Sequence, residues 1–137
     1  MEIEDARLEV DQRVVARLWN WTPDALRDNA RKGFKAEAAE GLDPTGYAVS
    51  VFAKTRAPGE SISSFLDRVC EEIREYRVAK WVALVPEEEL VDAGFRINLN
   101  EPPKDHYDIP VGSEEDSLRV DDLSRVFGTY NRRRMPK

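Results

Sequence analysis

The sequence is poor in the residues on which most catalytic and metal chemistry depends. Its 137 residues include one cysteine, Cys70, and one histidine, His106. A single cysteine excludes an intramolecular disulfide, and without a second histidine or a cysteine pair the three ligands of a metal site are not supplied. No G-x-G-x-x-G, G-x-x-x-x-G-K-[ST] or G-x-S-x-G motif occurs, so the usual phosphate-binding loops and nucleophile elbows are not expected. We expect neither a metal nor a cofactor.

Long hydrophobic runs are also missing. No apolar stretch approaches the roughly 18 residues of a membrane helix, and the acidic start MEIEDARLEV lacks the hydrophobic region of a secretory signal. We therefore expect a cytoplasmic protein. Its length fits one domain that buries a core without help from metals or disulfides.

Charge is unevenly distributed along the chain. Residues 129–137 carry no acidic group and four basic ones, whereas the other 128 residues hold 17 basic and 27 acidic groups, or −10. A body of that sign repels phosphate backbones, so nucleic-acid binding is expected only through the tail. We predict a globular domain over residues 1–128 and a basic tail over 129–137 that is disordered in isolation. Its arginines are Arg132, Arg133 and Arg134.

Apolar periodicity and turn residues predict a single α+β domain. We expect a mixed four- to five-stranded sheet with two long helices packed on one face. Cys70 falls on the apolar stripe of the second long helix, which predicts a buried thiol. The predicted strands cover 13–19, 47–53, 81–85 and 95–99, with an edge strand at 106–111. The predicted long helices cover 23–40 and 61–77, and short helices follow Pro86 and cover 121–127.

The segment Asp105-His106-Tyr107-Asp108 is the candidate reaction centre. In an extended chain His106 and Asp108 project from one face, and Asp105 and Tyr107 from the other. A carboxylate beside an imidazole fixes its tautomer and raises its basicity, as acid–base catalysis requires. The structural alternative is an edge histidine hydrogen-bonded to a neighbour, with Tyr107 packed inward.

Candidate contact residues lie at the end of the first predicted strand. Trp19 and Trp21 are two residues apart, so on a strand they share a face and one is available as an anchor for a partner. The alternative is that both cover the rim of the core. The arginines of the basic tail are the other binding candidates, against a purely solubilising role.

A resemblance to a group of proteins runs through much of the chain. The pairs Arg17-Leu18, Ser50-Val51 and Gly94-Phe95, followed by His106, are similar to small uncharacterised bacterial and phage proteins of this length. The resemblance implies a bacterial or phage context, near mobile-element or defence genes. It implies no activity and no catalytic residue.

Two functional hypotheses remain open, and they differ on whether the protein is an enzyme. The first is a non-enzymatic accessory or binding protein that acts through protein–protein contacts, as a defence- or toxin–antitoxin-type partner. The second is a small nucleotide- or nucleic-acid-processing hydrolase or transferase, with His106 as acid–base and Asp108 or Tyr107 assisting.

Overall fold

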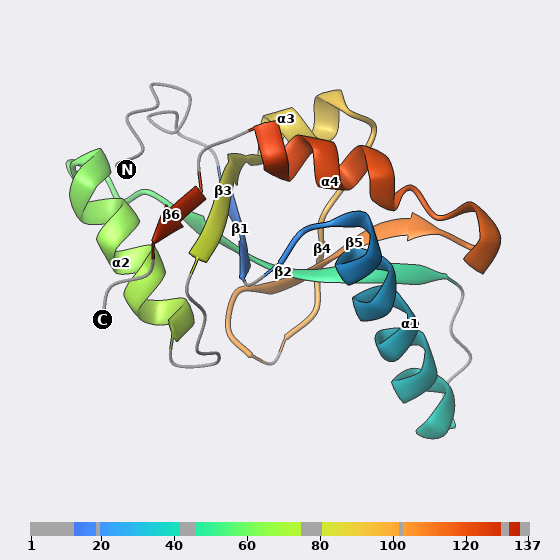
Figure 1. Cartoon of the computed structure of the whole chain (residues 1–137). Helices are drawn as coiled ribbons and strands as arrows, with labels where there is room; N and C mark the ends of the chain where they lie inside the picture. The colour runs from blue at the N-terminus through green and yellow to red at the C-terminus, as the bar shows by residue number, and fades with distance from the viewer. Residues whose placement is uncertain are drawn as a thin grey trace.

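The computed structural model describes a sheet with helices against both of its faces (Figure 1). The described residues are 13–18, 20–41, 46–74, 81–101, 103–129 and 132–134. Their strands are β1 (Arg13–Leu18), β2 (Tyr47–Thr55), β3 (Trp81–Pro86), β4 (Asn98–Leu99), β5 (His106–Gly112) and β6 (Arg132–Arg134). Their helices are α1 (Pro23–Ala39), α2 (Ile62–Arg74), α3 (Glu87–Asp92) and α4 (Val120–Thr129), with a short 3-10 helix, η2, at Glu115–Ser117.

Local sequence signals set the limits of α1 as predicted. The side chain of Thr22 caps the helix by accepting a hydrogen bond from the Ala25 amide at 3.3 Å, and Pro23 occupies the first helical position. Gly41 follows the last turn with a φ of +81°, a left-handed conformation that glycine adopts without steric cost. The helix therefore starts and stops where its caps require.

The strands form one antiparallel sheet in the order β4-β5-β2-β1-β3-β6. The α+β class and the single domain are confirmed, but the described strands contain no parallel pair, so the expectation of a mixed sheet is wrong. The predicted alternation of strands and helices gives the order of the elements along the chain, but it does not show whether neighbouring strands run parallel or antiparallel. Here β2 runs back along β1, with Arg13 opposite Thr55 and Ala16 opposite Phe52.

The two long helices lie on opposite faces of the sheet, which corrects the prediction that both cover one face. Alternate residues of β1 belong to different cores: Val15 joins the cluster with α1, α3 and α4, and Val14 joins the cluster with α2. Because side chains alternate along a strand, the two clusters occupy the two faces. Cys70 is buried in the α2 cluster, as its place on the apolar stripe predicted.

The edges of the sheet also differ from expectation. The strand predicted over 95–99 is reduced to β4, and β4 rather than β5 lies at that edge. Pro110 is tolerated in β5 because β4 pairs only with Tyr107 and Asp108, so Pro110 lies beyond that ladder. At the other edge, Arg132–Arg134 of the tail expected to be disordered pair with β3 as β6.

The segment 81–85 is a buried strand, as expected, and it lies next to the edge strand β6 rather than at the middle of the sheet. Val82, Ala83, Leu84 and Val85 are buried, and β3 lies between β1 and β6. Within the part of the chain that the structure describes, no helix combines the length and apolar character needed to cross a membrane.

Candidate functional site

His106 begins β5, in the hairpin that joins β4 to β5. Its Nδ1 lies 2.7 Å from the carbonyl oxygen of Asn100, and its own carbonyl accepts from the Asn100 amide at 2.9 Å. A carbonyl oxygen only accepts, so Nδ1 carries the proton and Nε2 is the basic nitrogen of this tautomer. The ring also meets Phe52 edge-on, with centroids 5.7 Å apart. A backbone carbonyl, rather than a neighbouring carboxylate, therefore orients the imidazole.

The neighbours of His106 are divided between the two faces of the sheet. Asp108 lies on the same face, where its carboxylate accepts a 2.7 Å hydrogen bond from the side-chain Nδ2 of Asn100. Tyr107 lies on the opposite face, packs against the α1 cluster and has the Arg13 guanidinium 4.9 Å from its ring centroid. The structure thus brings together His106 and Asp108 but not Tyr107. Asn100, which links the two, gave no signal in the sequence because the link depends on closure of the hairpin.

Asp105 departs from the simple alternation of an extended chain. It has a φ of +63° in the turn before β5, and its carboxylate lies 2.8 Å from the Nζ of Lys54 on the α2 face. Its amide donates to Glu101 at 2.8 Å. Lys54 is only 6% exposed and also approaches Glu72 of α2 at 3.5 Å. Asp105 therefore ties the hairpin to β2 and α2, and its carboxylate is engaged in that structural contact.

The clearest shifts in ionisation belong to ion pairs that hold the fold together. Hydrogen bonds from Arg68 to both carboxylate oxygens, each at 2.9 Å, lower the pKa of Glu60 to about 2, with a further contribution from a backbone amide. On the other face, hydrogen bonding to Glu87 raises the pKa of Arg13. The Arg13–Glu87 pair joins β1 to α3, and the Arg68–Glu60 pair ties α2 to the loop that precedes it, so these groups serve stability.

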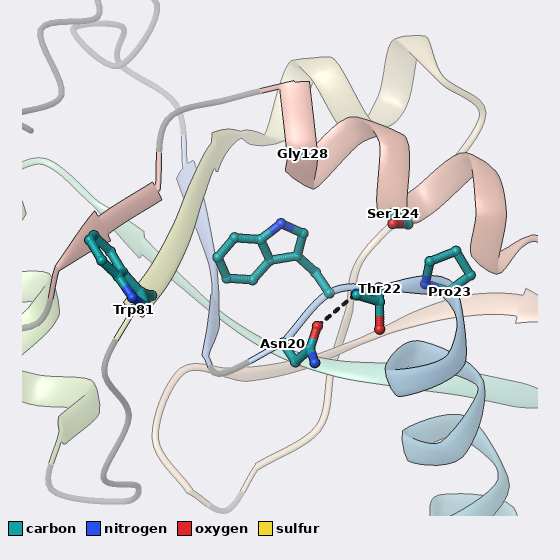
Figure 2. A pocket seen from close by; sticks show the side chains of 7 residues that line it. Asn20, Thr22, Pro23, Trp81, Ser124 and Gly128 are labelled. Atoms are coloured by element: carbon teal, nitrogen blue, oxygen red, sulfur yellow. Dashed lines mark hydrogen bonds between the residues drawn. The ribbon is translucent and has the colours of Figure 1, made fainter.

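A cleft of about 340 Å³ opens between the loop before α1, the start of β3 and the end of α4 (Figure 2). We call it the tryptophan cleft, because two indole side chains line it. In Figure 2 the stick of Trp81 stands on β3, and Ser124 and Gly128 mark α4 on the other side. The lining residues are Asn20, Trp21, Thr22, Pro23, Trp81, Ser124 and Gly128.

The loop that forms one wall of the cleft is held by its own hydrogen bonds. The side-chain oxygen of Asn20 accepts from the Thr22 amide at 3.0 Å, and the N-cap bond of Thr22 fixes the start of α1. Behind the loop, Arg17 is only 8% exposed and donates to the carbonyls of Asn20 at 3.4 Å and Ser50 at 2.8 Å. These bonds hold the wall in place.

The predicted contact residues are only partly within the described chain. Trp21 follows β1, is half-buried, packs on the core rim and lines the cleft. Trp19 lies outside the described residues. Trp81 was predicted only as part of a buried strand, and it reaches the cleft because β3 pairs with β1 beside that loop. The backbone of Arg132–Arg134 runs beside Trp81, with Arg134 opposite it.

Among the described residues, no group of three histidine, cysteine, aspartate or glutamate side chains is placed to hold a metal ion. Comparisons with protein-family models, curated proteins and solved structures found no match for the chain. The choice between a binding and a catalytic role therefore depends on the geometry of these side chains.

Proposed function

We propose that this is a non-enzymatic binding protein whose tryptophan cleft contacts another protein. The observation that carries the proposal is the pair of indoles, Trp21 and Trp81, in a concave site with walls from three elements. Tryptophan is enriched among the residues that dominate protein–protein binding energy, and such residues lie in pockets that exclude water. The bacterial accessory role expected from the sequence belongs to the same proposal.

The geometry favours this role over acid–base catalysis at His106. The residues expected to assist the imidazole have other contacts: Asp108 accepts from Asn100, and Tyr107 lies across the sheet. The cleft, in contrast, is lined by two indoles and a proline together with uncharged polar residues, a combination typical of a site that recognises shape and hydrophobic surface.

The proposal is tested by capture from cells of the native host with the tagged full-length chain. Trp81→Ala removes one wall, and Ser124→Gln extends a partly buried side chain at the cleft without removing an indole. Leu99→Ser is the matched control, because Leu99 is 61% exposed at β4, the opposite edge of the sheet from β6.

The wild type and Leu99→Ser should capture the same stoichiometric partner, and both cleft variants should lose it. Truncation of a dominant tryptophan costs about 2 kcal/mol, or roughly thirtyfold in Kd. Urea unfolding of each variant separates loss of binding from loss of fold. Recovery of no stoichiometric partner, or equal recovery by both cleft variants, would overturn the proposal.

A further inference from the structure

We infer that Arg17 and Asn29 are positioning residues of the tryptophan cleft, which together hold the loop that carries Trp21 as a wall of the site. This inference rests on the proposed function and adds the residues that prepare its site for binding. Two observations carry it. One is the way in which β1 separates from β2, and the other is the presence of two polar side chains where packing alone favours apolar ones.

β1 leaves β2 just before the cleft, although it stays paired with β3. Its ladder with β2 ends at Ala16, which lies opposite Phe52. Its ladder with β3 continues to Leu18, which lies opposite Val82. If the register between β1 and β2 continued, Leu18 would lie opposite Ser50. The separation of the strands therefore takes β1 away from the backbone of Ser50 and leads the chain into the loop of the cleft.

Two side chains take the place of β1 at Ser50. The Ser50 amide donates to Asn29 Oδ1 at 2.8 Å, and the Ser50 carbonyl oxygen accepts from Arg17 Nη1 at 2.8 Å. Arg17 Nη1 also donates to Asn29 Oδ1 at 3.2 Å, so this oxygen accepts from two donors, which is its full capacity. Because backbone groups that lose their ladder need other partners, these bonds are what allow β1 to separate from β2 at this point.

The same guanidinium supports the loop itself. Arg17 Nε donates to the carbonyl oxygen of Asn20 at 3.4 Å, and the Asn20 side chain accepts from the Thr22 amide at 3.0 Å, the bond drawn in Figure 2. Trp21 lies between these two residues, so hydrogen bonds that lead back to Arg17 enclose its backbone on both sides. Support of this kind holds a contact side chain in its binding geometry and reduces the entropy that binding would otherwise cost.

Neither polar residue is the one that packing alone would favour. Arg17 shares a face of β1 with the fully buried Val15 and is itself only 8% exposed. Asn29 lies inside α1, although asparagine is a poor helix former. Replacing a buried charged group with an apolar one is often neutral or stabilising, and residues that break the local pattern are expected near functional sites. Positioning of the loop gives both residues a physical reason.

Fluorine NMR of the full-length chain labelled with 5-fluorotryptophan tests the inference, because it reports on each indole without a ligand. The signals of Trp21 and Trp81 are assigned by their loss in Trp21→Phe and Trp81→Phe. Arg17→Met and Asn29→Leu remove the hydrogen bonds at similar side-chain size. Asn29→Asp keeps the acceptor oxygen and serves as the conservative variant.

Arg68→Met is the matched control. Arg68 also donates to a backbone carbonyl, that of Thr55 at 3.0 Å, but it belongs to α2, which packs on the opposite face of the sheet from α1. Urea unfolding of every variant measures its loss of stability separately from the fluorine signals. Asn29→Leu keeps the inference testable if Arg17→Met does not fold.

Arg17→Met and Asn29→Leu should shift and broaden the Trp21 signal, because the unsupported loop samples several conformations, and they should leave the Trp81 signal in place. Asn29→Asp should keep the wild-type Trp21 signal. Arg68→Met should lower stability without moving it. In capture from host cells, Arg17→Met and Asn29→Leu should weaken binding of the partner about tenfold, since apparent affinity falls with the fraction of binding-competent molecules.

An unchanged Trp21 signal in Asn29→Leu, an equal disturbance of that signal by Arg68→Met, or equal shifts of Trp21 and Trp81 would each overturn the inference. Its failure is distinguishable from failure of the proposed function. If Trp81→Ala abolishes capture but Arg17→Met and Asn29→Leu change neither the signal nor the capture, only the positioning role is wrong. If the Trp21 signal moves but capture is indifferent to the cleft variants, the proposed function falls and the support of the loop has no role in binding.

Discussion

Lys54 and Asp105 form an ion pair in which the lysine is buried and the aspartate is partly exposed. The strength of the pair can be predicted from these two exposures. The side chain of Lys54 is 5% exposed and that of Asp105 is 29% exposed, and the Nζ–Oδ2 distance is 2.8 Å. Surface pairs contribute about 0.2–1 kcal/mol, whereas breaking a fully buried pair costs about 3–5 kcal/mol. Because only one partner is fully removed from water, we expect a coupling energy of about 1–2 kcal/mol.

A double-mutant cycle measures this coupling. The variants are Lys54→Met, which keeps an apolar side chain of similar length, Asp105→Asn, and the two together. Asparagine is chosen because it tolerates the positive φ of residue 105. The cycle also separates the Asp105 contact from the second contact of Lys54, with Glu72 at 3.5 Å, since that contact is lost equally in both Lys54→Met backgrounds.

The assay is urea unfolding at neutral pH, followed by circular dichroism. A coupling energy below about 0.3 kcal/mol would refute the reasoning, because the pair would then behave as a weakly interacting surface pair despite the burial of Lys54. A value above about 3 kcal/mol would show that the carboxylate is effectively removed from water as well.

Three further predictions concern the ion pairs and the two cores. Glu60 has a folded pKa of about 2, below the ordinary value of 4.5, so its stabilising contribution is complete above pH 4.5 and is lost as pH falls through 2. The unfolding free energies of the wild type and of Glu60→Gln should therefore converge as the pH is lowered. A difference that stays constant with pH would contradict this. Arg13→Lys should cost about 0.5–1 kcal/mol in urea unfolding, because lysine cannot reproduce the two-pronged contact with Glu87, whereas unchanged stability would show that this contact contributes little. Phe65→Ala and Phe127→Ala should each lower the free energy of unfolding by about 3–5 kcal/mol in thermal or urea unfolding, because both side chains are fully buried. The two losses should add, since the side chains lie on opposite faces of the sheet, and strong non-additivity would argue against two separate cores.

Most elements of the fold could be predicted from sequence because their signals are local. The cap at Thr22 and Pro23, the apolar stripe that contains Cys70, and the β-branched run of β2 depend only on neighbouring residues. Strand direction and the face chosen by each helix depend on contacts between distant segments. An amphipathic helix shows which of its sides is apolar, but not which face of a sheet it covers.

The candidate site was less predictable, for the same reason. Alternation along β5 correctly separated His106 from Tyr107, but the turn at Asp105 broke that alternation through its positive φ. Trp81 had only the signature of a buried strand residue. Its place in the cleft arises from the pairing of β3 with β1, which places it near a loop about sixty positions earlier in the chain.

The sequence alone determined the α+β class, the extent of most helices and strands, and the separation of an acidic body from a basic C-terminal segment. These properties follow from periodicity, caps and charge, which act over a few residues. Only the tertiary structure decided that Trp21 and Trp81 line one cleft and that the backbone of Arg132–Arg134 pairs with β3 beside Trp81. That arrangement depends on strand order, which is set by the packing of both faces of the sheet at once and leaves no local mark in the sequence.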